Sequence, residues 1–87
     1  LFTKIDILNY CKLEFLRAFG DDALRFCKIS SSEGMVPVGN HIERCLNITF
    51  SFTSERYYNM AKELNFEEYL QVNVEMRKSS NWNIKIN

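Results

Sequence analysis

The sequence is 87 residues long, enough for one small domain with a single hydrophobic core. Eleven basic side chains balance eleven acidic ones, so net charge gives no general attraction to nucleic acid or to an anionic membrane. No apolar run reaches the roughly 18 residues that a membrane-spanning helix needs, and the polar residues near the start exclude a signal-peptide core. We expect residues 1–87 to form one α+β domain. Because the sequence does not begin with methionine, we also expect this domain to be excised from a longer chain.

The first segment, residues 1–19, has the periodicity of an amphipathic helix. Its apolar residues recur at spacings of three and four, at Leu1, Ile5, Leu8, Cys11, Phe15 and Phe19. Gly20 can end this helix because glycine adopts the left-handed conformation without a steric penalty. Residues 20–22 are therefore predicted to form a turn.

Two strands separated by a loop are expected next. Residues 23–30 predict a short strand with apolar side chains on both faces. Residues 30–40 contain the only proline and two of the three glycines, so we expect a loop. Residues 44–53 predict a central strand, because apolar and polar side chains alternate from Leu46 to Thr53.

The rest of the chain predicts a second helix followed by two more strands. Residues 53–65 have the helical period, with Thr53 or Ser54 as the N-cap and Asn65 at the end. Residues 68–78 return to period two, and their inward side chains are expected to be Leu70, Val72, Val74 and Met76. Residues 78–81 then turn into a final strand over 81–87.

This α-β-β-α-β-β order predicts a four-stranded antiparallel sheet with two helices packed on one face. The other face would be open and rich in amides and hydroxyls. Its asparagines are unusual, because asparagine is disfavoured in strands. Its expected members are Asn47, Thr49, Gln71, Asn73, Asn81, Asn83 and Lys85.

Three interpretations of this face compete. It is a solvated surface of an asparagine-rich protein, a surface that docks another protein, or a sheet that binds nucleic acid. Uncharged amides cost less to desolvate than charges and can hydrogen-bond across an interface, which suits docking. The last strand could also be an edge that accepts a partner's strand. RNA or single-stranded nucleic acid would instead need exposed aromatic and basic residues, for which the candidates are Tyr69, Arg77, Lys78 and Lys85.

Catalytic and metal-binding patterns are weak. His41 precedes Cys45 by four residues without a nucleophile signature around it. Cys11, Cys27, His41 and Cys45 supply zinc-ligand types, but no CxxC spacing is present. We therefore predict no enzyme, no cofactor and no metal, and three reduced cysteines in an intracellular protein.

The sequence thus favours a protein–protein interaction or assembly module of a larger intracellular protein or complex. The partner would be another protein or a second copy, with nucleic acid as the alternative and no membrane contact. The open-face residues form the first candidate contact. Met35 and Val38 in the loop form a second one.

Overall fold

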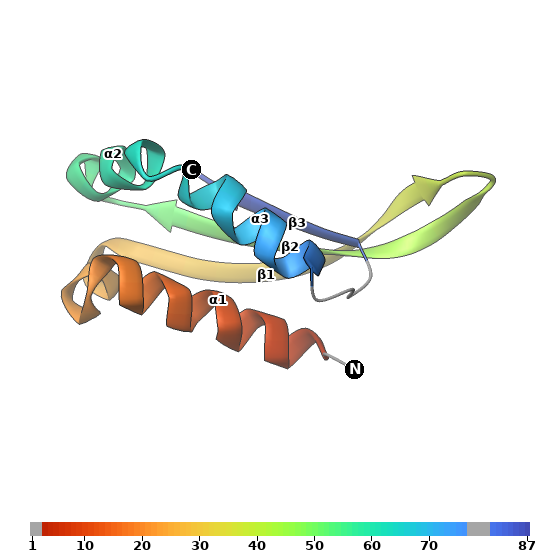
Figure 1. The fold of residues 1–87 in the computed structure, drawn as a ribbon, viewed down its shortest axis with the longest axis horizontal. Coiled ribbons are helices and arrows are strands. Elements are labelled where there is room, and N and C mark those ends of the chain that lie inside the picture. The colour runs from red at the N-terminus through yellow and green to blue at the C-terminus, as the bar shows by residue number, and fades with distance from the viewer. Residues whose placement is uncertain (1–2, 77–80) are drawn as a thin grey trace.

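The computed structural model describes residues 3–76 and 81–87. Its elements are α1 (Lys4–Phe19), the 3₁₀ helix η1 (Asp21–Phe26), β1 (Cys27–Val38), β2 (His41–Phe52), α2 (Glu55–Glu63), α3 (Phe66–Met76) and β3 (Asn81–Ile86). The strands form one mixed sheet in the order β1-β2-β3, in which β1 is antiparallel and β3 parallel to β2 (Figure 1). The α+β class is confirmed, but the predicted element order and four-stranded antiparallel sheet are wrong.

The main error is the strand predicted over residues 68–78, because residues 66–76 form α3. Phe66, Leu70 and Val74 follow one another at spacings of four and are buried. Val72 and Met76, predicted to point inward, are exposed. Since α2 and α3 carry the chain back across the sheet, β3 joins β2 in parallel rather than through a hairpin.

The predicted loop over residues 30–40 is also wrong. Most of it belongs to β1, which pairs with β2 without interruption from Cys27 opposite Phe52 to Val38 opposite His41. The strand predicted from residue 23 begins only at Cys27, after η1. Gly39 has a φ of 62°, so a glycine is suited to the two-residue turn that joins the strands.

The helix predicted over residues 1–19 ends at Phe19 as expected but begins only at Lys4, and α2 lies within its predicted range. The Thr3 Oγ1 accepts from the Asp6 N–H at 3.2 Å while the Asp6 carboxylate accepts from the Thr3 N–H at 2.9 Å, which makes a capping box. Ser54 caps α2 by accepting from the Tyr57 N–H at 3.5 Å. Asn65 adopts a φ of 51° between α2 and α3, as expected for a residue that ends a helix.

The hydrophobic core lies between the helices and one face of the sheet. Phe15 of α1 is fully buried, and its ring stacks on that of Phe50 in β2 with centroids 5.8 Å apart. The buried core cluster also includes Ile7, Cys11, Ala23, Cys27, Leu46, Ile48, Ala61, Phe66, Leu70, Val74, Ile84 and Ile86. Strand alternation leaves the opposite face to polar side chains.

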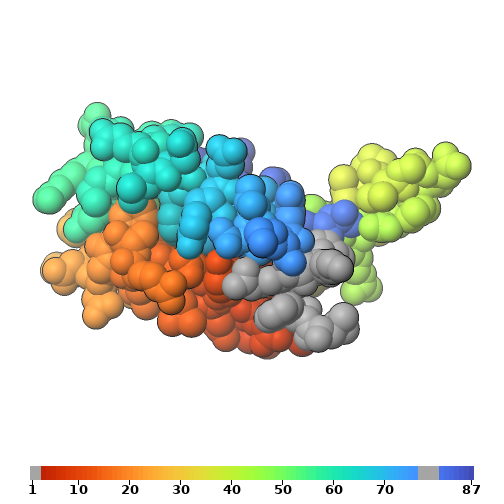
Figure 2. Space-filling view, in the orientation of Figure 1, coloured from red at the N-terminus to blue at the C-terminus, as the bar shows by residue number. Residues whose placement is uncertain are grey.

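The β1–β2 hairpin extends well beyond the helices. Its distal part, residues 34–43, projects from the body in Figures 1 and 2, and we call it the hairpin arm. Among the described residues, no helix combines the length and apolarity needed to cross a membrane.

Candidate functional site

The sheet face that points away from the core, here called the open face, is built from alternate residues of all three strands. The register sets Asn83 beside Asn47 and Lys85 beside Thr49. On this face β1 supplies Lys28, Ser30 and Ser32; β2 supplies Glu43, Cys45, Asn47, Thr49 and Ser51; and β3 supplies Asn81, Asn83 and Lys85. Five of the seven predicted open-face residues therefore come together, namely Asn47, Thr49, Asn81, Asn83 and Lys85.

The asparagines of this face hydrogen-bond across the strands. The Asn83 Nδ2 donates to the Asn47 Oδ1 at 3.4 Å. The Asn81 Nδ2 donates to the Glu43 Oε1 at 2.8 Å and to the Arg44 carbonyl at 3.2 Å. These amides therefore bind one another and their neighbours, which gives the alternating asparagines a role within the sheet.

Gln71 and Asn73 lie on α3 and do not belong to the open face. The Gln71 side chain bonds the β3 backbone, donating to the Trp82 carbonyl at 2.8 Å. The Asn73 side chain donates to the Tyr69 carbonyl at 2.7 Å within its own helix. Both were misplaced because residues 68–78 have the period-two pattern of a strand.

Charge on the open face is sparse and mostly positive. Among the described residues, Glu43 is the only carboxylate that strand alternation places there. It accepts from the Asn81 side chain and bonds the His41 Nε2 at 2.6 Å, and these two contacts lower the pKa of Glu43. Lys28 and Lys85 are exposed on the same face. The open face thus presents cations, amides and hydroxyls, and its one carboxylate is already engaged.

The hairpin arm carries the second candidate contact. Met35 and Ile42 are each 65% exposed, and the register puts Pro37 directly opposite Ile42. These three side chains share one face of the arm by alternation, whereas Val38 lies on the other face. Sequence reasoning identified Met35 and missed Ile42, because a predicted loop gives no pairing that would bring Ile42 beside it.

Tyr69 points toward α1 and away from the open face. Its hydroxyl donates to the Glu14 Oε2 at 3.0 Å, and the other oxygen of this buried carboxylate bonds the Arg17 guanidinium at 3.1 Å. The hydrogen bond to Glu14 raises the pKa of Tyr69. Tyr69 is therefore a helix–helix contact rather than part of a nucleic-acid platform. Of the other residues proposed with it, Lys85 is on the open face, while Arg77 and Lys78 lie outside the described residues.

His41 and Cys45 share a face of β2 but are too far apart to act together, since four residues of extended strand span about 13 Å. His41 bonds Glu43 instead. The proposed zinc set is dispersed as well, because Cys11 is buried in α1 while His41 is on the arm. Burial also raises the pKa of the Cys27 thiol to about 11, which disfavours the thiolate that metal binding requires.

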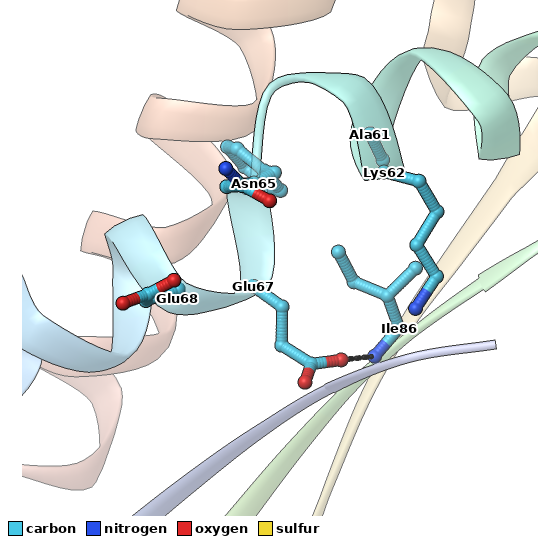
Figure 3. A pocket seen from close by; sticks show the side chains of 7 residues that line it. Ala61, Lys62, Asn65, Glu67, Glu68 and Ile86 are labelled. Atoms are coloured by element: carbon cyan, nitrogen blue, oxygen red, sulfur yellow. Dashed lines mark hydrogen bonds between the residues drawn. The ribbon is translucent and has the colours of Figure 1, made fainter.

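A hollow of about 190 Å³ lies at the turn between α2 and α3 (Figure 3). Lys62 and Glu67 reach from this turn toward β3, and the Glu67 Oε2 accepts from the Ile86 N–H at 2.9 Å. The carboxylate is thus held by the strand backbone and is not poised as an acid or base. No family model, curated protein or solved structure matches the chain, so the function is inferred from these surfaces.

Proposed function

We propose that this domain binds another protein and that the hairpin arm is the principal contact. The observation that carries the proposal is the exposure of Met35 and Ile42, 65% each, on a ribbon that projects beyond the helices. A two-stranded hairpin without a covering layer is marginally stable in water. Covering its apolar face would stabilise the arm and the complex together.

The free energy gained by burying Met35 and Ile42 in an interface is large enough for recognition. Burial of an isoleucine or methionine side chain contributes about 1.5–3 kcal/mol, and each 1.4 kcal/mol corresponds to about a tenfold change in affinity. Arg44 lies opposite Met35 and is exposed at the base of the arm, where it adds a polar contact beside the apolar face. Such an apolar centre with a polar rim is typical of protein interfaces.

Matched charge substitutions test the proposal. The Met35→Glu/Ile42→Glu variant places two carboxylates on the arm. The Ile5→Glu/Leu13→Glu variant makes the same changes at α1 residues that are 68% and 62% exposed. We expect the arm variant to lose protein capture by at least about tenfold while the α1 variant captures like the wild type. Equal capture by both variants would contradict the proposal.

A second candidate function is nucleic-acid binding by the open face. It is favoured because this face exposes two lysines while its carboxylate is already hydrogen-bonded. Lys28 and Lys85 lie among amides and hydroxyls, and Glu43 is paired. Amides and hydroxyls hydrogen-bond base edges, and a β-ribbon fits the major groove. Strand alternation places no phenylalanine, tyrosine or tryptophan on this face among the described residues, so we expect a duplex rather than stacked single-stranded bases.

Binding of short duplex and single-stranded probes over a salt series tests this candidate. Lys28→Ala/Lys85→Ala should weaken binding and reduce the salt slope by about one per lysine. Lys12→Ala/Lys62→Ala changes exposed lysines of α1 and α2 and should leave the slope unchanged. Absence of binding at low salt would end this candidate.

A further inference from the structure

The outer edge of β3 is the strand edge that faces away from β2. The Asn87 N–H donates to the Phe50 carbonyl at 2.9 Å, and the Asn87 carbonyl accepts from the Phe52 N–H at 3.1 Å. Because backbone directions alternate along a strand, Asn83 and Lys85 also direct their backbone groups toward β2. The backbone groups of Trp82, Ile84 and Ile86 therefore point outward.

Two side chains of α3 occupy this edge. The Gln71 carboxamide donates to the Trp82 carbonyl at 2.8 Å and accepts from the Ile84 N–H at 2.9 Å. Glu67 accepts from the Ile86 N–H at 2.9 Å, as Figure 3 shows. The Gln71 side chain thus makes the pair of hydrogen bonds that the N–H and C=O of one residue in a parallel neighbouring strand would make.

The spacing of these contacts follows from helix and strand geometry. Glu67 and Gln71 are four residues apart on α3, a rise of about 6 Å. Ile84 and Ile86 are two residues apart on β3, about 6.6 Å. Since the lengths match, the two side chains cover successive outward groups while Leu70 and Val74 of the same helix stay buried.

We infer that Gln71 and Glu67 close a strand-pairing edge whose occupant, once they are removed, is β3 of a second copy of this chain. An open edge is a template for pairing with another chain, and proteins guard such edges. The segment from Asn81 to Ile86 suits this pairing because it contains no proline or glycine and only one charge.

The β3 sequence is self-complementary in the register that the outward groups require. Antiparallel pairing about a two-fold axis at Ile84 sets Trp82 opposite Ile86 of the second copy. It also sets Asn83 opposite Lys85, so no two like charges face each other. An aromatic side chain opposite a β-branched one is a favourable cross-strand pair. This complementarity selects a second copy over an unrelated strand.

Two matched double variants test the inference. Glu67→Ala/Gln71→Ala removes the three hydrogen bonds and leaves the outward backbone groups of Trp82, Ile84 and Ile86 without these side-chain partners. Glu67→Lys/Gln71→Lys removes the same bonds but places two cations over the edge, where charge opposes strand pairing. Gln71→Ala alone, which loses two of the bonds, is a milder variant. Circular dichroism first confirms that each variant is folded.

The readouts are molar mass by light scattering over a tenfold concentration range and amide hydrogen exchange at Ile84 and Ile86. For the alanine variant we expect the mass to at least double relative to the wild type at the highest concentration. The exchange protection of both amides should be lost on dilution and regained on association. The lysine variant should lose protection and keep the wild-type mass.

Two results would overturn the inference. One is an alanine variant with wild-type mass at every concentration. The other is equal association of the alanine and lysine variants, which would mean that the variants associate because the fold is destabilised and not through the β3 edge. The inference is independent of the hairpin arm, because every substitution is on α3.

Discussion

Asn83 of β3 lies directly beside Asn47 of β2, and its side-chain nitrogen donates to the Asn47 side-chain oxygen at 3.4 Å. This pairing is a consequence of the parallel register, which sets residues of the two strands side by side on the open face. It explains how asparagine can occupy alternate strand positions. On the same face Glu43 is bonded by Asn81 and His41, so the one carboxylate that strand alternation places there among the described residues is paired, which the nucleic-acid candidate relies on.

The Asn47–Asn83 bond should contribute little to stability. It is long and Asn83 is exposed, so a double-mutant cycle with Asn47→Ala and Asn83→Ala should give a coupling free energy of about 0.5 kcal/mol or less. Urea unfolding of the wild type, both single variants and the double variant measures it. A coupling above about 1.5 kcal/mol would show instead that the asparagine pair is a main support of the sheet.

Phe15 should be among the most costly core residues to truncate. It is fully buried and its ring contacts those of Phe19, Phe50, Phe52 and Phe66. We expect Phe15→Ala to lower the free energy of unfolding by about 3–5 kcal/mol. Leu13→Ala on the exposed side of α1 should change it by no more than about 0.5 kcal/mol. Urea unfolding decides this, and equal effects would mean that α1 packs through another face.

Tyr69 should make stability depend on alkaline pH. Its hydrogen bond to Glu14 raises its folded-state pKa above the usual value of 10.0. A raised pKa means that the stabilising contribution is fully present below the unfolded value and is lost as pH rises through the folded one. The stability advantage of the wild type over Tyr69→Phe should therefore shrink above pH 10. An advantage that is constant across this range would show that the hydroxyl is not bonded to Glu14.

The capping box of α1 gives the opposite pH dependence. Hydrogen bonds from Thr3 lower the pKa of Asp6 below its usual value of 3.8. Its contribution is therefore present above that value and is lost as pH falls through the lowered one. Thr3→Ala should cost about 1 kcal/mol at neutral pH because it removes the capping hydroxyl. Asp6→Ala removes the carboxylate that the Thr3 N–H donates to, and its stability difference from the wild type should shrink in acid. Thermal unfolding at several pH values measures both effects, and a pH-independent difference would show that Asp6 takes no part.

Sequence patterns predicted the elements that are determined by a clear periodicity or by capping residues close in the sequence. The stripe of α1 and the alternation of β2 each gave one interpretation, and the N-cap of α2 was narrowed to Thr53 or Ser54, of which the structure has Ser54. In α3 the pattern was ambiguous, because Leu70 and Val74 fit both a helix and a strand. Phe66, four residues before Leu70, is buried and resolves the ambiguity in favour of the helix.

The remaining errors concern contacts between distant parts of the chain. Residues 30–38 look like a loop because they are polar and contain Pro37, yet uninterrupted pairing with β2 makes them a strand. That pairing also brings Ile42 beside Pro37 on the arm, which no local pattern shows. The hydrogen bonds from Gln71 to the outer edge of β3 likewise depend on how α3 packs beside that strand, which no local pattern shows.

The most direct test of the central claim is protein capture from a nuclease-treated lysate by three baits in parallel: the wild type, Met35→Glu/Ile42→Glu and Ile5→Glu/Leu13→Glu. The account predicts a protein that is retained by the wild type and the α1 variant and is reduced by at least about tenfold with the arm variant. Nuclease treatment separates this result from retention through nucleic acid. Equal retention by all three baits, or retention that vanishes with nuclease, would contradict docking through the hairpin arm.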